Sequence, residues 1–234
     1  MLDTRELSPL AGRAFAAVLF DLDGTLIDST ASVDRVWGRW AREYGIDMDG
    51  FTVQHGVPAR AQLAGLIPAD EIETEFLKLE RMEVEDLEGV VQLPGAADAL
   101  AALPAGRAAI ATSGTRPLAE ARIRHTGIRI PQVVVTAEET HVGKPDPEPY
   151  LLAAQRLGVA ARDCLVVEDA PAGLAAGHAA GCTTLGLTTS HDRRELDADA
   201  FAANLAEVRF TMQDDRVRVL VASRQWQGPT ADNQ

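Results

Sequence analysis

Short runs of consecutive apolar residues alternate with amphipathic segments along this chain. Five runs have the length of a strand, at 14–20, 108–112, 133–136, 164–168 and 183–187. An uninterrupted apolar run is typical of a strand that is buried on both faces of a sheet. Helical periodicity lies between the later runs, at about 116–125, 147–157 and 171–180. Strands that alternate with helices predict an α/β fold with a Rossmann-like parallel sheet.

The segment before Pro94 breaks this alternation. Apolar residues at helical spacing predict two helices there, the first carrying Val33, Val36, Trp37, Trp40 and Tyr44 and the second, at about 71–84, carrying Ile72, Phe76 and Leu79. We interpret the two tryptophans as core residues rather than as a platform for a sugar. We therefore predict a helical cap domain at 27–92, inserted into a core domain made of 1–26 and 93–222.

Alternation of apolar and polar residues returns near the C-terminus. Apolar residues occupy 208, 210 and 212 before Asp214-Asp215 and 217, 219 and 221 after it. This pattern predicts a C-terminal β-hairpin. The polar segment 223–234 is expected to be a disordered tail.

Composition narrows the classes of partner. A formal net charge of −13 and a pI of about 4.8 argue against nucleic acid or an anionic membrane. No apolar run reaches the roughly 18 residues that a membrane-spanning helix needs. Cys164 and Cys182 each lie in an apolar segment, which favours two buried thiols in a reducing cytoplasm over a disulfide framework.

Two carboxylates directly follow the first apolar run. Asp21 and Asp23 leave the end of this strand on the same side, and Gly24 lets the chain turn away from them. An Asp-Gly pair after a strand can be a plain hairpin turn. The same spacing also suits one carboxylate that attacks while its neighbour transfers a proton.

Three further polar clusters follow later strands. Thr112-Ser113 could cap a helix or bind a phosphate oxygen, and Lys144 lies between prolines in a rigid loop. Glu168-Asp169 could begin a helix, yet two adjacent acids that close an apolar strand are costly without a cation. Because open α/β sheets bind ligands at the carboxyl ends of their strands, we expect these clusters to meet there.

These four segments, in this order, resemble the motifs of the haloacid dehalogenase superfamily of phosphotransferases. Asp21-Leu-Asp-Gly-Thr25 resembles the first motif, Thr112 the second, Lys144 the third and Glu168-Asp169 the fourth. The resemblance covers nearly the whole chain and includes the helical cap. The segments around these residues are similar to bacterial hexitol and sugar-phosphate phosphatases, and to fungal glycerol-3-phosphate and 2-deoxyglucose-6-phosphate phosphatases.

The resemblance implies a Mg²⁺-dependent hydrolase that takes phosphate off small sugar or polyol esters through an aspartyl-phosphate. Asp21 would be the nucleophile and Asp23 the general acid and base. Thr112, Ser113 and Lys144 would hold the phosphate oxygens.

The resemblance also implies the metal ligands and a role for the cap. Mg²⁺ would be held by Asp21, the backbone carbonyl of Asp23 and Asp169, with Glu168 close by. Candidate substrate contacts in the cap are the three residues His55, Gly56 and Arg60. A lone His and Arg in a cap loop can equally be surface residues. A monomer is the expected form.

Two other functions are possible, an isomerase with the same four motifs and a non-catalytic protein with the same fold. A β-phosphoglucomutase-type isomerase commonly has Val where this chain has Thr25, and a His in the first cap helix, where this chain reads Ser29-Thr-Ala-Ser-Val33. A non-catalytic sugar-phosphate-binding protein would not need both Asp21 and Asp23. Hydrolysis is therefore the leading hypothesis, and these two remain the alternatives.

Overall fold

A computed structural model describes residues 7–47, 53 and 57–221 of the chain. Its centre is a six-stranded sheet in which every neighbouring pair is parallel, in the order β5-β4-β1-β6-β7-β8. The strands are β1 Ala17–Phe20, β4 Ala108–Ala111, β5 Val133–Val135, β6 Cys164–Glu168, β7 Thr183–Leu187 and β8 Ala200–Ala202. The predicted parallel sheet is confirmed. The sequence prediction missed β8, a three-residue strand at the sheet edge.

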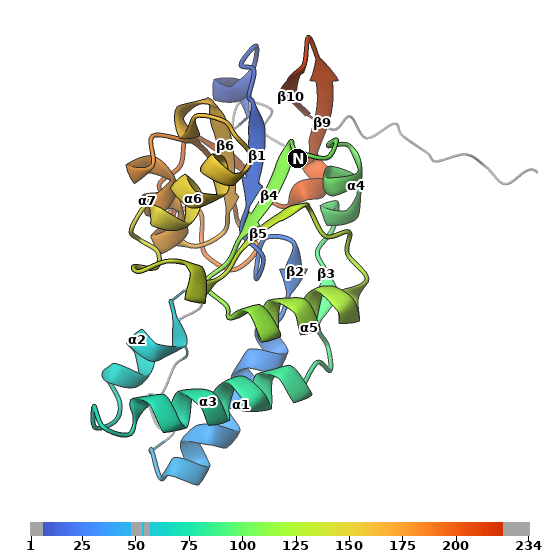
Figure 1. Cartoon of the computed structure of the whole chain (residues 1–234). Coiled ribbons are helices and arrows are strands. Elements are labelled where there is room, and N and C mark those ends of the chain that lie inside the picture. Colours follow the sequence, from blue (N-terminus) through green and yellow to red (C-terminus); the bar gives the residue numbers. More distant parts are fainter. Residues whose placement is uncertain (1–6, 48–52, 54–56, 222–234) are drawn as a thin grey trace, which may run out of the picture.

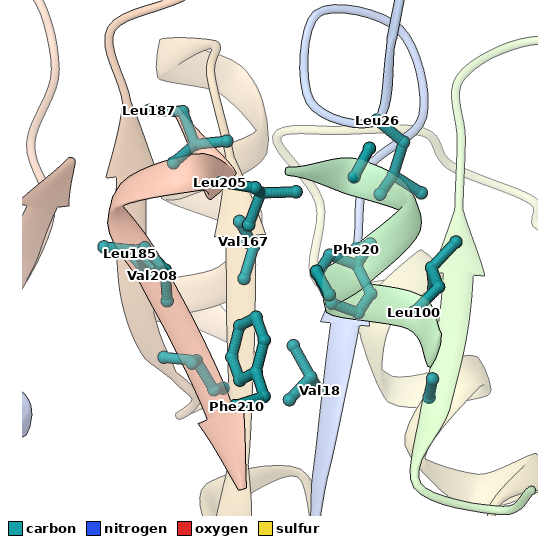
Figure 2. Close-up of a cluster of buried hydrophobic side chains, with 14 of the residues drawn as sticks. Val18, Phe20, Leu26, Leu100, Val167, Leu185, Leu187, Leu205, Val208 and Phe210 are labelled. Atoms are coloured by element: carbon teal, nitrogen blue, oxygen red, sulfur yellow. The ribbon is translucent and has the colours of Figure 1, made fainter. Parts of the chain in front are cut away.

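Helices cover both faces of this sheet (Figure 1). They are α4 Ala96–Ala101, α5 Arg116–Thr126, α6 Glu148–Arg156 and α7 Pro171–Ala179. Because side chains alternate along a strand, β1 buries Ala17 and Leu19 toward α6 and α7, and Val18 and Phe20 toward the opposite face. Figure 2 shows Val18 and Phe20 in the hydrophobic cluster on this opposite face, next to Phe210 of the hairpin.

That hairpin consists of β9 Val208–Gln213 and β10 Arg216–Val221, paired in antiparallel register. Asp214 and Asp215 form its two-residue turn, with φ angles of 50° and 58°. A turn with both central residues in the left-handed region matches the twist of the flanking strands, and Asp tolerates it better than most residues. The predicted hairpin is confirmed, and it packs Phe210, Val217 and Val219 against the sheet.

A separate group of helices lies below the sheet in Figure 1. It consists of α1 Thr30–Tyr44, α2 Ala59–Ala64 and α3 Ile72–Glu85. Their apolar faces form a hydrophobic cluster of their own, in which Trp40 is fully buried and Trp37 is 2% exposed. The short antiparallel pair β2 Ile27–Asp28 and β3 Val91–Gln92 joins the points where the chain leaves and re-enters the sheet region.

These elements lie where the cap was predicted, and α2 is an addition to the two predicted helices. The division into 27–92 and the flanking core segments stays a prediction, and the predicted tail at 223–234 lies outside the described residues. Within the described ranges, no helix combines the length and the apolar character needed to cross a bilayer.

Cys164 and Cys182 are free and buried, as predicted. Burial raises the pKa of each thiol to about 12. Because the thiolate is the reactive form, we expect iodoacetamide to leave both cysteines unmodified in the native protein at pH 8 and to modify both in urea. Mass spectrometry of the two samples measures this, and rapid modification of the native protein would contradict the burial of the two thiols.

Candidate active site

The four polar clusters converge at the carboxyl ends of β1, β4 and β6. The sheet order places β1 between β4 and β6, so the residues that follow these strands are neighbours in space. Together with the loop around Lys144 and the helices α1 to α3, they line a cavity of about 410 Å³. The cavity-lining residues that the sequence predicted are Asp21, Asp23, Arg60, Thr112, Ser113, Lys144 and Asp169.

Lys144 is a buried cation that bridges two of the predicted acids. Its Nζ lies 2.5 Å from Asp21 Oδ1 and 2.7 Å from Glu168 Oε1. Burial alone would lower the pKa of Lys144, but the ion pairs with Asp21 and Glu168 outweigh it, and the pKa is raised above its ordinary value. Lys144 is therefore a permanent positive charge at the floor of the cavity.

Glu168 holds Lys144 in position and is itself held by hydrogen bonds. Its Oε1 also accepts a hydrogen bond from the Tyr150 hydroxyl at 3.0 Å, and its Oε2 accepts from the backbone N–H groups of Asp169 and Ala170. The carboxylate thus accepts four hydrogen bonds from protein groups, which fix its orientation.

Asp21 and Asp169 carry negative charge that the protein only partly balances. Burial raises the pKa of Asp21, and Glu168 and Asp169 add to this against the opposing effect of Lys144. Burial and the nearby Glu168 likewise raise the pKa of Asp169 to about 7, although Ser190 and Thr25 donate hydrogen bonds to it. Such shifts mark a site in which a further cation would be favourable.

This cluster has the donor set of a divalent metal site. One carboxylate oxygen from each of Asp21, Glu168 and Asp169 lies within 4.8 Å of the others. Three carboxylates face one ammonium group, so the cluster has a formal surplus of two negative charges. Buried oxygen ligands with this surplus fit a hard divalent cation.

Two glycines allow this close packing of acids. Gly24 has a φ of +88°, and a Cβ at this position would lie 2.1 Å from Asp169 Oδ2. A Cβ at Gly173, in the first turn of α7, would lie 1.6 Å from Glu168 Oε1. The chain therefore approaches both carboxylates at distances that only glycine permits.

We expect Gly173→Ala to destabilise the protein by about 2 kcal/mol, because the new methyl group must push Glu168 away from Lys144 and Tyr150. The urea midpoint of unfolding measures this. Gly65→Ala is the matched control, since its Cβ would meet only the Gln62 carbonyl, at 3.5 Å. Equal midpoints for the two variants would contradict the packing around Glu168.

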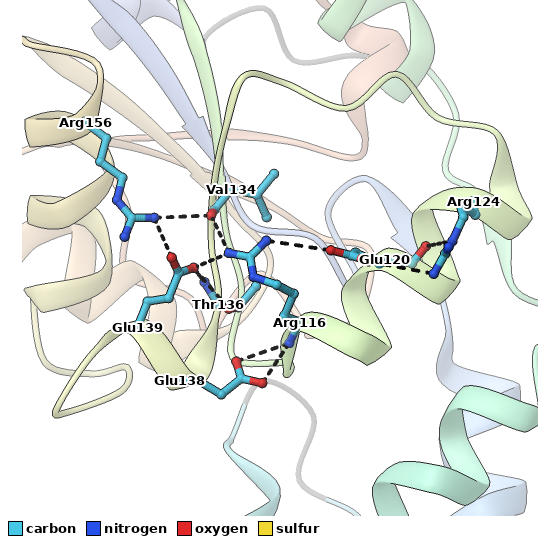
Figure 3. Close-up of polar contacts among 8 residues, drawn as sticks. All are labelled: Arg116, Glu120, Arg124, Val134, Thr136, Glu138, Glu139 and Arg156. Atoms are coloured by element: carbon cyan, nitrogen blue, oxygen red, sulfur yellow. Dashed lines mark hydrogen bonds and ion pairs between the residues drawn. The ribbon is translucent and has the colours of Figure 1, made fainter.

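The predicted phosphate-binding residues Thr112, Ser113 and Lys144 all line the cavity. Thr112 directly follows β4, and its hydroxyl accepts a hydrogen bond from the Gly114 N–H at 3.0 Å. This bond shapes the turn that carries Ser113 into α5. Figure 3 shows how the turn is braced from outside, because Glu138 accepts two hydrogen bonds from the Arg116 N–H and Glu139 pairs with both Arg116 and Arg156.

The predicted cap contacts are only partly described. Arg60 lines the cavity, but its guanidinium pairs with Glu73 at 3.0 Å and lies over the Phe76 ring. His55 and Gly56 lie outside the described residues.

The sequence analysis did not identify Arg122, Glu83 and Ser190, which also line the cavity. Arg122 of α5 and Glu83 of α3 are charged residues on otherwise apolar helix faces, beside Leu118 and Ile123 in one case and Phe76 and Leu79 in the other. A charge within an apolar stripe is a signal that could have found them. Ser190, which follows β7 and donates to Asp169, gave no sequence signal.

Comparison with known proteins identifies the family. A model of the haloacid dehalogenase-like hydrolases matches residues 15–181. The chain belongs to this family. The predicted resemblance is thereby confirmed.

Relatives within the haloacid dehalogenase-like family include phosphatases of small polyols. Hexitol phosphatase A of Escherichia coli is 44% identical over 203 residues, which cover 83% of this chain and 94% of that protein. Glycerol-1-phosphate phosphohydrolase 2 of Saccharomyces cerevisiae is 37% identical over 227 residues, which cover 87% and 89%. The crystal structure of CbbY from Rhodobacter sphaeroides in complex with xylulose-(1,5)bisphosphate matches with a TM-score of 0.72 and 25% identity, over 82% of this chain and 96% of that chain.

Proposed function

We propose that this chain is a Mg²⁺-dependent phosphomonoester hydrolase that acts on small sugar or polyol phosphates through an aspartyl-phosphate on Asp21. The observation that carries the proposal is the position of Asp21, whose carboxylate lines the cavity, pairs with Lys144 and belongs to the acidic cluster. The names of the similar phosphatases support the substrate class.

In the first step, a carboxylate oxygen of Asp21 forms a bond to phosphorus while the bond from phosphorus to the ester oxygen breaks. Asp23 gives its proton to the departing oxygen, and a sugar or polyol leaves. In the second step, water attacks the phosphorus, the Asp21 oxygen leaves, and Asp23 takes the proton of that water. Phosphate departs, and both carboxylates return to their starting states.

Thr112, Ser113 and Lys144 are the proposed phosphate ligands. A hydroxyl, a backbone N–H and an ammonium group can follow the non-reacting oxygens as charge moves through the transition state. The fixed position of Lys144 supports this role, since Glu168 and Tyr150 hold it before any substrate binds.

Asp21, Asp169 and the backbone carbonyl of Asp23 are the proposed Mg²⁺ ligands. Glu168 lies in the same cluster, but its four hydrogen bonds favour a role as the anchor of Lys144. The ion, when bound, supplies positive charge that screens the approach of an anionic ester to an anionic nucleophile.

The cap is the proposed source of specificity. Arg60, with His55 and Gly56, would contact the sugar or polyol part of the substrate. Release of Arg60 from Glu73 would be needed for this contact, and the pair is exposed enough for water to replace it.

The proposal includes a monomer that acts in the cytoplasm on a small molecule rather than on a nucleic acid. The net charge of −13 argues against nucleic acid and the two free thiols support the cytoplasm, whereas the monomer rests on the resemblance to the family.

Phosphate release from a panel of esters tests the function. The panel includes hexitol phosphates, hexose 6-phosphates, glycerol phosphates, phosphoglycolate and β-glucose 1-phosphate, each with Mg²⁺ and with a chelator. We expect release from one or more sugar or polyol phosphates, loss with chelator and recovery with added Mg²⁺. Conversion of β-glucose 1-phosphate to glucose 6-phosphate without release would favour the mutase, and no reaction with any ester would favour a binding protein.

A further inference from the structure

Arg122 is a buried cation on a helix face that is otherwise apolar. It lies in α5, which packs on the cap helix α3 (Figure 1), and its side chain is 4% exposed. A guanidinium group is always charged and is rarely buried without partners. Its partners therefore indicate its role.

The first partner is the carboxylate of Asp23. Arg122 Nη1 donates to Asp23 Oδ1 at 2.9 Å, and the hydroxyl of Ser29 donates to the same oxygen at 2.8 Å. Two donors on one oxygen fix the rotation of this carboxylate. The other oxygen, Oδ2, is then the one that can exchange a proton with a substrate or a water.

The second partner comes from the cap. Arg122 Nη2 lies 3.5 Å from Glu83 Oε1, and the Glu83 side chain is 9% exposed. Burial raises the pKa of Glu83, while Arg122 and a hydrogen bond from Trp37 act against this rise. Arg122 thus stabilises the carboxylate form of Glu83 against the effect of burial.

The contact between Arg122 and Glu83 is incomplete. Among the described residues, Nε and Nη2 of Arg122 are buried and have no hydrogen-bond partner. A buried donor without a partner is unfavourable, and more so when it is charged. A movement of α3 toward α5 by about 0.5 Å would bring Glu83 into hydrogen-bonding distance of Nη2.

We propose that Arg122 is a positioning residue, which rests on the proposed function, and that it links the cap to proton transfer. Arg122 holds Asp23 Oδ1 so that Oδ2 faces the departing oxygen. Glu83 holds Arg122 in turn, so the position of the cap helix α3 controls the orientation of Asp23.

The leaving group of the substrate distinguishes this role from a merely structural one. Expulsion of the alkoxide of glycerol 1-phosphate needs a proton from Asp23, whereas p-nitrophenolate leaves without one. The experiment is rapid-quench measurement of phosphoenzyme formation in the first turnover, with each ester, for the full-length enzyme with Mg²⁺. We expect Arg122→Met to slow this step about 100-fold with glycerol 1-phosphate and to leave p-nitrophenyl phosphate within about threefold.

A double-mutant cycle tests the link to the cap. Glu83→Gln should slow phosphoenzyme formation from glycerol 1-phosphate by about 10-fold. The double variant should be no slower than Arg122→Met alone, because Glu83 acts through Arg122. Arg124→Met is the matched control, since this arginine of α5 is exposed and pairs with Glu120 (Figure 3), so its loss should change neither rate. If Arg122→Met does not fold, Arg122→Lys gives the same comparison, because an ammonium group cannot reach both carboxylates as a guanidinium does.

Equal slowing of the two esters, or no slowing of either, would overturn the positioning role of Arg122. Losses from Glu83→Gln and Arg122→Met that multiply would overturn the link to the cap. Both results leave the proposed function standing, provided that the wild-type enzyme forms a phosphoenzyme. A wild-type chain that forms none with either ester contradicts the proposed function itself.

Discussion

Asp21→Asn is expected to lower phosphatase turnover by about 10⁴-fold or more while the fold stays intact. An amide is a poor nucleophile and forms no acyl phosphate, so the proposed chemistry stops at its first step. The substitution is nearly isosteric and removes one of three crowded carboxylates. Burial and the neighbouring acids raise the pKa of Asp21, so its removal relieves repulsion in the metal-free protein.

Two measurements check this prediction. Phosphate release gives the turnover, and thermal unfolding should give a midpoint equal to or above that of the wild type. Asp98→Asn is the matched control, because Asp98 is exposed on α4, at the opposite end of the sheet from the cavity (Figure 1). Appreciable turnover by Asp21→Asn would exclude Asp21 as the nucleophile.

Lys144→Met is expected to cause the largest loss of stability of any single change in the site. Removal of one member of a buried ion pair leaves uncompensated charge and typically costs about 3–5 kcal/mol. Here Asp21 and Glu168 would both lose their partner, since the Lys144 side chain is 3% exposed and bridges them. Activity should fall as well, because the proposed phosphate ligand is lost.

The midpoint of thermal unfolding checks this prediction, with and without Mg²⁺. For a chain of this size the expected fall is about 10 °C. Mg²⁺ should restore part of it, because an ion that binds the native carboxylates offsets the lost ammonium. Lys78→Met is the control. Lys78 is the only other lysine of the chain and pairs on the surface with Glu43, so its removal should change the free energy of unfolding by less than about 1 kcal/mol. A midpoint for Lys144→Met that equals the wild type would refute the buried bridge.

The central part of the fold could be predicted because its strands are buried on both faces. β1 and β6 are uninterrupted apolar runs for this reason, and each ends at the acids that line the cavity. By contrast, β8 and α4 are too short to show a period. Tertiary contacts position them, since β8 pairs with β7, and α4 packs on the hairpin strand β9.

Some residues of the candidate site could likewise be predicted from the sequence, and others could not. Asp21, Thr112, Lys144 and Asp169 could be predicted because each directly follows a strand or lies in a distinctive loop. The link from Glu83 through Arg122 to Asp23 could not, because it joins three elements that are distant in sequence. Its distances depend on how α3 packs on α5, which no local pattern specifies.

Detection of the covalent intermediate tests the central claim most directly. The Asp23→Asn variant should form the aspartyl-phosphate from p-nitrophenyl phosphate and hydrolyse it slowly, because the base for the second step is missing. After a rapid acid quench, mass spectrometry should find one added phosphoryl group on the peptide that contains Asp21, and none in the Asp21→Asn variant. A phosphoryl group on another residue, or turnover by the wild type with no phosphorylated peptide in any variant, would contradict the mechanism.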